Sequence, residues 1–174
     1  MTANYNDIRT LHNLLDYDVR KFTIAEIQLQ KVLNLWIKKA SSVKLKNNLQ
    51  RYSDYVAEHV IAFEHFYEEE NIPSISISNR VMQAFIDEAE EKINYCSDAA
   101  VRDASLLASI QEINHYKIST YGTASAFANA LGMTKTAEVF HKAEINEKQI
   151  DDRLSQLAIH EINLDAKISI DLPK

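Results

Sequence analysis

Four polar side chains occupy positions in the sequence where an apolar residue is expected. Each interrupts the apolar stripe of a different long segment, near the middle of that segment: Glu26, His59, Asn114 and Glu147. A carboxylate buried in a protein core is costly unless it is paired or bound to a metal ion. Because the four residues lie at similar depth, we expect them to meet in one shared site. Carboxylate and imidazole ligands of this kind suit iron or manganese.

Further polar residues flank these positions. Asp151, one turn after Glu147, completes a candidate set of metal ligands with Glu26 and His59. Candidates for the edge of the site are Asp18, Tyr55, His115 and Tyr121. The alternative is that each inward polar residue is simply hydrogen-bonded, as single polar residues in protein cores usually are. The residue types alone leave both interpretations open.

The elements that must position these residues are helices. Apolar residues recur at alternating three- and four-residue steps, which is the spacing of one helix face. The pattern is broken at the Ser41–Ser42 pair, at residues 71–79 and at Gly132. We therefore predict helices at about 7–40, 45–70, 81–96, 98–132 and 134–163. Asp98 and Thr134 are predicted to cap the last two helices, and Gly132 is predicted to be left-handed.

The composition favours the same fold class. Two glycines and two prolines in 174 residues are too few for a sheet of short strands, and 46% hydrophobic content is enough for one core. We predict a single all-α domain over residues 1–162 and a C-terminal tail over 163–174. Four long helices, with an additional short helix in the connection between the second and third, indicate a ferritin-like four-helix bundle. A coiled-coil rod fits less well, because no stripe continues across the breaks.

Charge and hydropathy exclude several partners. The net charge of -6 is spread along the chain, which argues against nucleic acid. No segment approaches the ~20 consecutive apolar residues of a membrane span, and the first residues lack the pattern of a signal peptide. We expect a cytoplasmic protein without a membrane partner. Cys96 is the only cysteine, so the chain cannot form an internal disulfide or a thiolate metal cluster.

Several runs of residues resemble a known family. They are Arg102–Leu107, Asn114–Thr123 and Leu131–Gly132, with Ala25–Glu26 in the first helix and Glu147–Lys148 in the last. The sequence Asn-His-Tyr-Lys-Ile-Ser-Thr-Tyr-Gly, which begins at Asn114, is similar to Glu-His-Tyr-Glu-Ile-Ala-x-Tyr-Gly. That segment is a hallmark of the YciE/YciF family of bacterial ferritin-like stress proteins, which the chain resembles over nearly its whole length.

The resemblance implies a ferritin-like bundle that forms a homodimer and is induced by stress. In some members it also implies a carboxylate site for two metal ions. This chain departs from the family pattern at that site. Where the hallmark has two glutamates, it has Asn114 and Lys117. Asp54, a further candidate for the edge of the site, takes a place usually held by glutamate. Tyr55, next to Asp54, has no carboxylate to offer a metal.

These substitutions predict a loss of metal affinity. Replacing two glutamates by Asn114 and Lys117 makes the site more positive by three charges. At an effective dielectric constant of ~20 this costs a bound metal pair several kcal/mol. We expect Lys117 to pair instead with a carboxylate that persists, which is Glu26, Glu147 or Asp151. We therefore predict no cofactor, with iron as the metal if the site is functional.

The sequence thus predicts a stress-associated ferritin-like protein with a partly degenerate metal site and a structural or other non-catalytic role. The alternative is an enzyme, a di-iron or mononuclear iron oxidase or peroxidase of the rubrerythrin type. Its centre would consist of Glu26, His59, Glu147 and Asp151, with Tyr55 or Tyr121 nearby. Metal content separates the two hypotheses.

Overall fold

The described part of the chain is entirely helical. The computed structural model describes residues 8–69 and 78–167. The helices are α1 (Leu11–Lys39), α2 (Val43–Glu69), α3 (Arg80–Tyr95), α4 (Ala99–Ala130), α5 (Thr134–Leu157), a π-helical segment η1 (Ala158–Ile162) and α6 (Asn163–Ala166). The prediction of an all-α protein is therefore confirmed. Across these ranges, none of the helices has an apolar stretch long enough to cross a membrane.

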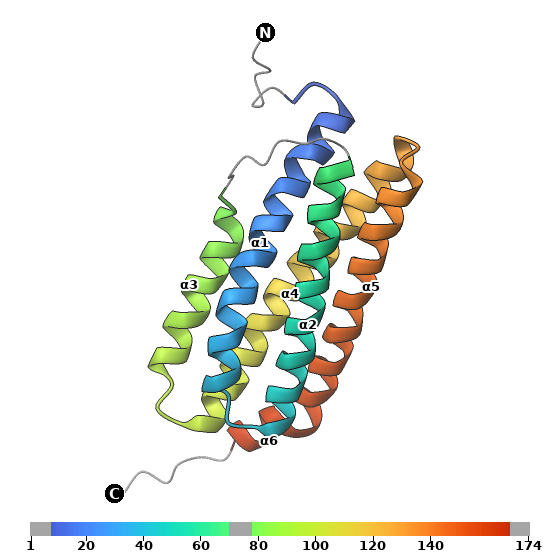
Figure 1. Cartoon of the computed structure of the whole chain (residues 1–174). Helices are drawn as coiled ribbons and strands as arrows, with labels where there is room; N and C mark the ends of the chain where they lie inside the picture. Colours follow the sequence, from blue (N-terminus) through green and yellow to red (C-terminus); the bar gives the residue numbers. More distant parts are fainter. Residues whose placement is uncertain (1–7, 70–77, 168–174) are drawn as a thin grey trace, which may run out of the picture.

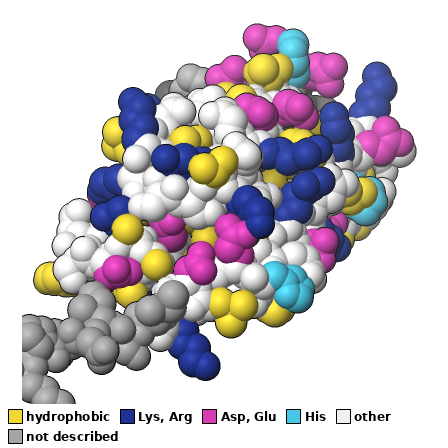
Figure 2. Space-filling model, turned by 90° about the horizontal axis from the view of Figure 1, so that it is seen from below, with side chains coloured by type: hydrophobic (Ala, Val, Ile, Leu, Met, Phe, Trp, Pro, Cys, Tyr) yellow, Lys and Arg dark blue, Asp and Glu magenta, His cyan; other side chains and the backbone are white. Residues whose placement is uncertain are grey.

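Four long helices form a closed ring. The contacts run from α1 to α2, from α2 to α5, from α5 to α4 and from α4 back to α1. The shorter α3 packs outside this ring against α1 and α4, and Figure 1 shows it along the outer side of α1. Seen from the end where α1 meets α2, Lys and Arg side chains are interspersed with Asp and Glu side chains (Figure 2). The charges of the sequence are therefore also mixed on this part of the surface.

A layer of polar side chains divides the apolar core. On one side lies a cluster around the fully buried Trp36 and Tyr52, and on the other a cluster around Phe63 and Phe140. In three of the long helices, inward polar residues separate the two clusters: His59 in α2, Asn114 and Lys117 in α4, and Glu147 in α5. In α1 the clusters meet between Phe22 and Ala25, and the inward Glu26 follows directly. The four helices therefore carry their polar residues at the same level of the bundle.

Two of the predicted helix ends are confirmed. The Asp98 carboxylate accepts hydrogen bonds from the backbone N–H groups of Ala100 and Val101, as an N-cap does. Gly132 has a φ of 72°, the left-handed conformation predicted for the end of α4. Of the predicted connection at 71–79, residues 71–77 lie outside the described ranges, and Asn79 forms the N-cap of α3.

Other helix ends differ from the prediction. Helix α1 starts at Leu11, later than predicted, because the Thr10 side chain caps the Asn13 N–H. Thr134 is the first residue of α5 and Met133 occupies the cap position, so the predicted Thr134 cap is wrong. Helical backbone also continues through Asn163–Ala166, beyond the predicted fraying at 163. The division into a domain ending at 162 and a tail stays a prediction.

A buried carboxylate fixes the turn between α1 and α2. Asp103 of α4 is 3% exposed and accepts hydrogen bonds from the Ser41 N–H at 2.8 and 3.1 Å and from the Ser42 N–H at 2.6 Å. The neighbouring Arg102 guanidinium donates to Ser41 Oγ. These donors precede α2 and would otherwise lack partners at its N-terminus. The Arg102–Asp103 pair thus holds the end of α1 and the start of α2 against α4.

Replacing Asp103 by asparagine is expected to lower the free energy of unfolding by about 1–3 kcal/mol, because an amide NH₂ would face backbone N–H groups in a buried place. Urea unfolding followed by circular dichroism measures the change. The matched control is Asp54→Asn on the exposed face of α2, for which we expect a change within about 0.5 kcal/mol. Equal effects of the two substitutions would contradict the role assigned to Asp103.

Candidate functional site

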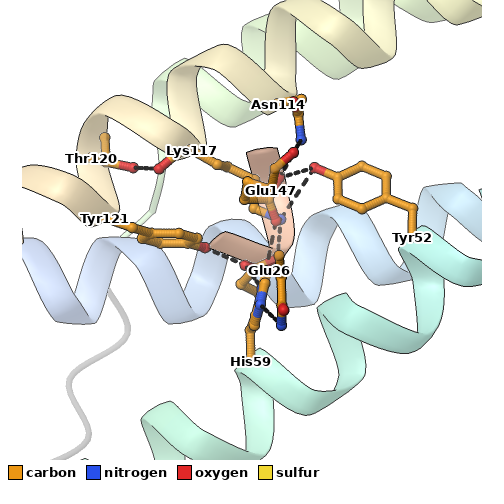
Figure 3. Close-up of polar contacts among 9 residues, drawn as sticks. Glu26, Tyr52, His59, Asn114, Lys117, Thr120, Tyr121 and Glu147 are labelled. Atoms are coloured by element: carbon orange, nitrogen blue, oxygen red, sulfur yellow. Dashed lines mark hydrogen bonds and ion pairs between the residues drawn. The ribbon is translucent and has the colours of Figure 1, made fainter. Parts of the chain in front are cut away.

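The polar layer brings together residues from all four long helices. Figure 3 shows side chains from α1, α2, α4 and α5 converging on one point. The ligand atoms of Glu26, His59 and Glu147 all lie within 4.8 Å of one another, and all three side chains are buried. Asn114 joins them through its amide, which donates to Glu147 Oε2 at 2.6 Å. The four inward polar residues of the sequence therefore do share one site.

The Lys117 ammonium lies between the two carboxylates. Its Nζ is 2.9 Å from Glu26 Oε2 and 2.6 Å from Glu147 Oε1. The lysine side chain is 1% exposed and both glutamates are fully buried. Two tyrosine rings flank the ammonium, with centroids at 4.7 Å for Tyr52 and 5.8 Å for Tyr121. Lys117 therefore pairs with Glu26 and Glu147, two of the three carboxylates that the sequence predicted as its partners.

Hydrogen-bond donors occupy the other carboxylate oxygens. The Tyr52 hydroxyl donates to Glu147 Oε2 at 2.9 Å and accepts from Lys117 Nζ at 3.2 Å. The Tyr121 hydroxyl donates to Glu26 Oε1. Asn114 also donates to the backbone carbonyl of Glu147 at 3.0 Å. Each buried carboxylate is thus compensated by a cation and by neutral donors together.

His59 is oriented by a second amide. Asn146 is 8% exposed, and its Nδ2 lies 3.3 Å from His59 Nε2. Because an amide nitrogen only donates, Nε2 accepts, and the proton lies on Nδ1. Nδ1 is 2.9 Å from Glu26 Oε1 and 3.6 Å from Glu147 Oε1. The imidazole therefore donates to the Glu26 carboxylate.

The two glutamates differ in their affinity for a proton. Burial raises the pKa of Glu26, but the charges and hydrogen bonds of Lys117, His59 and Tyr121 outweigh it, and the pKa is lowered overall. Burial also raises the pKa of Glu147; the Lys117 charge opposes this and the Glu26 charge adds to it, so that this pKa stays above its ordinary value. Glu26 is therefore the more firmly ionised partner of Lys117.

Sequence reasoning placed some residues at the site that lie elsewhere. Asp151 is half-buried on the surface between α4 and α5, where its Oδ1 is 3.1 Å from Nε2 of the exposed His115. Asp151 lies one turn beyond Glu147 in α5 and faces the outer side of α4. Asp54 is exposed and accepts a hydrogen bond from Gln50. Neither Asp151 nor Asp54 belongs to the group of gathered ligand atoms.

Among the other residues predicted at the edge of the site, some lie away from the polar layer and one lies inside it. Tyr55 is half-buried and donates to Gln149 Oε1 at 3.0 Å, away from the polar layer. Asp18 is half-buried on α1, and burial raises its pKa, with Lys21 opposing. Of the predicted edge residues, Tyr121 alone lies inside the cluster.

Two members of the cluster were missed as site residues. Tyr52 fits the apolar stripe of the second helix, but it precedes His59 by seven residues and therefore shares its helix face. Asn146 precedes Glu147 directly and lies beside the predicted inward position. Their position relative to another inward polar residue was the signal that could have identified them. Tyr52 lies two turns before His59, and Asn146 is the immediate neighbour of Glu147.

The donor set does not fit a two-metal centre. Two carboxylates and one imidazole could surround a single ion, but a pair of metal ions bridged by carboxylates needs more anionic ligands. The Lys117 ammonium also contacts both glutamates, and Tyr52, Tyr121 and Asn114 donate to the remaining oxygens. The carboxylate oxygens that a metal would require already contact the Lys117 ammonium or accept hydrogen bonds from other side chains.

Truncating Lys117 to methionine is expected to lower the free energy of unfolding by about 3–5 kcal/mol, because it leaves two carboxylates buried without their shared cation. Denaturant unfolding of the variant and the parent protein measures the difference. The control is Lys148→Met, which removes a lysine that is 56% exposed and paired with Glu144. We expect the control to cost less than about 1 kcal/mol, and a similar loss in both variants would refute the central role of Lys117.

Tyrosines of the site should make the fold sensitive to alkali. Burial raises the pKa values of Tyr52 and Tyr121 well above 10.0, and it raises that of Tyr67 to about 12. The unfolded chain gives up these protons at lower pH than the folded chain. The stabilising contribution is therefore complete below the ordinary tyrosine pKa of 10.0 and is lost as the pH rises toward the folded values.

Phenolate absorbance measures this effect. At about pH 11, at least three of the eight tyrosines should stay protonated in the folded protein but not in urea. The Tyr52→Phe variant should have one protected tyrosine fewer. Ionisation of all eight tyrosines while the circular dichroism stays helical would contradict the burial of these hydroxyls.

Comparison with known proteins shows the family to which this chain belongs. Residues 10–167 match the family described as a domain of unknown function, DUF892. Protein YciF of Escherichia coli (strain K12) is 28% identical over 162 residues, which are 92% of this chain and 98% of YciF. The crystal structure of the E. coli stress protein YciF has a TM-score of 0.85 and 28% identity, covering 90% of this chain and 99% of that one.

A second solved structure has the same fold. YcfI from Rhodopseudomonas palustris has a TM-score of 0.83 and 24% identity, covering 89% of this chain and 98% of that one. These matches confirm the resemblance to YciE/YciF that the Tyr-Gly segment of α4 indicated, and they extend over nearly the whole chain. This chain therefore belongs to the DUF892 family.

Proposed function

We propose that this protein is a ferritin-like four-helix bundle with α3 as its additional short helix, and that it serves the stress response without catalysing a reaction. In this proposal the carboxylate site is degenerate, and the ammonium of Lys117 takes the place of a metal. The observation that carries the proposal is the position of Lys117 Nζ between Glu26 Oε2 and Glu147 Oε1, at 2.9 and 2.6 Å.

Charge repulsion supports the exclusion of metal. A divalent cation held by Glu26 and Glu147 would have to share these carboxylates with the ammonium that contacts both. A separation of about 4 Å illustrates the cost. At an effective dielectric constant of ~20, repulsion between a double and a single positive charge at that distance costs roughly 8 kcal/mol.

The comparisons support the role in stress. The E. coli relative described as a stress protein matches this chain along 98% of its own length. A homodimer, a cytoplasmic location and the absence of nucleic-acid and membrane partners complete the proposal. Oligomeric state is open to a direct check by light scattering during gel filtration.

One observation favours a second candidate function. Glu26, His59 and Glu147 gather their ligand atoms within 4.8 Å, which is close enough for one iron ion if Lys117 were displaced. A mononuclear iron site of this kind would support oxidase or peroxidase chemistry. The two candidates make opposite predictions about iron content.

The deciding experiment is metal analysis of protein purified without chelator and then incubated anaerobically with ferrous iron. We expect iron near zero per chain by mass spectrometry, because Lys117 holds both carboxylates. A stoichiometry of one or two irons per chain would overturn the non-catalytic proposal, and peroxide consumption would then be measured on the loaded protein.

The double substitution Asn114→Glu and Lys117→Glu is expected to create iron binding, because it restores two anionic ligands and removes the cation. Ferrous iron should also raise the melting temperature of this variant, since the added carboxylates need a cation. The control is Lys148→Glu, which adds a carboxylate outside the core and should bind no iron. A double variant that folds but binds no iron would show that the lysine is not what excludes the metal.

A further inference from the structure

We propose that Lys117 Nζ and the carboxyl group of Glu147 condense into a side-chain amide bond that joins α4 to α5 covalently. The inference rests on the proposed function, in which Lys117 is the permanent occupant of the cluster. It goes further by assigning a chemical reaction to the contact, so that the ion pair becomes a covalent link within the bundle.

The reacting groups are held together without water. Lys117 Nζ lies 2.6 Å from Glu147 Oε1, so the carboxyl carbon is only one C–O bond further away. The lysine side chain is 1% exposed and the glutamate is fully buried. Two groups fixed in this way react as if at very high concentration, because binding has already removed their freedom of motion. A dry core also favours release of a water molecule over hydrolysis of the product.

The reaction balances with the groups present. Lys117 begins as an ammonium ion and Glu147 as a carboxylate. A proton leaves the ammonium, the amine attacks the carboxyl carbon, a C–N bond forms, and one C–O bond breaks. The departing oxygen leaves as water with two protons that come from the ammonium. The product is a neutral amide, and no oxidant, reductant or other reactant is required.

Donors are in place for the oxygen that gains charge during the attack. The Tyr52 hydroxyl donates to Glu147 Oε2 at 2.9 Å, and the Asn114 amide donates to the same oxygen at 2.6 Å. Fixed donors aimed at an oxygen of the reacting carboxyl group stabilise the tetrahedral intermediate of acyl transfer. Asn114 takes the place of an anionic metal ligand of the family pattern, and in this reaction its amide serves as a hydrogen-bond donor to the reacting carboxyl group.

Glu26 is placed to carry the protons. Its Oε2 is 2.9 Å from Lys117 Nζ, so it can take a proton from the ammonium and return it to the departing oxygen. Its other oxygen accepts from Tyr121 and from His59, which hold the carboxylate in position. Glu147 is the expected partner of the amide bond, because its contact with Lys117 is the shorter one and its other oxygen has both Tyr52 and Asn114 as donors.

The product has fewer charges in the core. Condensation removes one positive and one negative charge from a fully buried place, so the net charge of the cluster stays the same and Glu26 loses its ammonium partner. Glu26 keeps His59 as its partner at 2.9 Å. A covalent bond between α4 and α5 would also restrict the unfolded chain as a disulfide does, in a sequence whose only cysteine is Cys96.

The first test is the mass of the denatured full-length protein. We expect an intact mass lower than that of the sequence by one water molecule, and a branched proteolytic peptide that joins Lys117 to Glu147. A wild-type protein that keeps its full sequence mass after prolonged incubation at 37 °C overturns the amide bond, and so does a branched peptide that ends on Glu26. Full mass with no bound iron leaves the proposed function intact, whereas bound iron refutes that function whatever the mass.

Three variants test the assigned roles. Lys117→Arg keeps the positive charge but lacks a nucleophilic amine, so it should have its full sequence mass. Glu26→Gln keeps both reacting groups but cannot carry the proton, and it should also stay at full mass. Glu147→Gln should give the same product as the wild type, because ammonia leaves in place of water. Circular dichroism shows that each variant is folded, and mass loss in folded Lys117→Arg would refute the assignment.

Discussion

Burying two carboxylates in a helical core is the constraint on which this structure depends. Glu26 and Glu147 are fully buried, and their loss of solvation is compensated by Lys117, which contacts both, and by His59, which contacts Glu26 at 2.9 Å. The four helices can close around these residues only when their polar levels coincide. The polar layer therefore fixes the longitudinal register of the bundle, which two apolar clusters alone would specify less strictly.

Other polar contacts secure the same register from the ends of the helices. Asp103 holds the turn between α1 and α2 against α4, and Asn79 caps α3 while its amide donates to the Lys21 carbonyl of α1. Glu90 of α3 accepts a hydrogen bond from Trp36 of α1 at 2.5 Å. These contacts each join segments distant in sequence. They help to hold the helices at the level where the short contacts around Lys117 form.

The proposals share one physical idea, that a side chain of the protein itself occupies the place of a metal ion. An exchangeable metal leaves when its ligands are protonated or when a competing chelator is present, whereas a lysine belongs to the chain. Such a core keeps its shape under conditions that remove metals. A stress-associated protein whose role is structural would benefit from that property, and covalent capture of Lys117 by Glu147 would make the occupancy permanent.

The sequence by itself determined the helical class, most of the helix bounds, the level of the polar layer and the identity of Glu26, His59, Asn114 and Glu147, because helical periodicity reports which face of each helix is inward. It predicted three possible carboxylate partners for Lys117 and could not choose among them. It also predicted that Asp151 and Tyr55 lie at the site, whereas they contact His115 and Gln149 elsewhere. It also passed over Tyr52 and Asn146. Only the tertiary structure decided these points, because the rotation of each helix about its axis and the reach of long side chains depend on packing against the other helices.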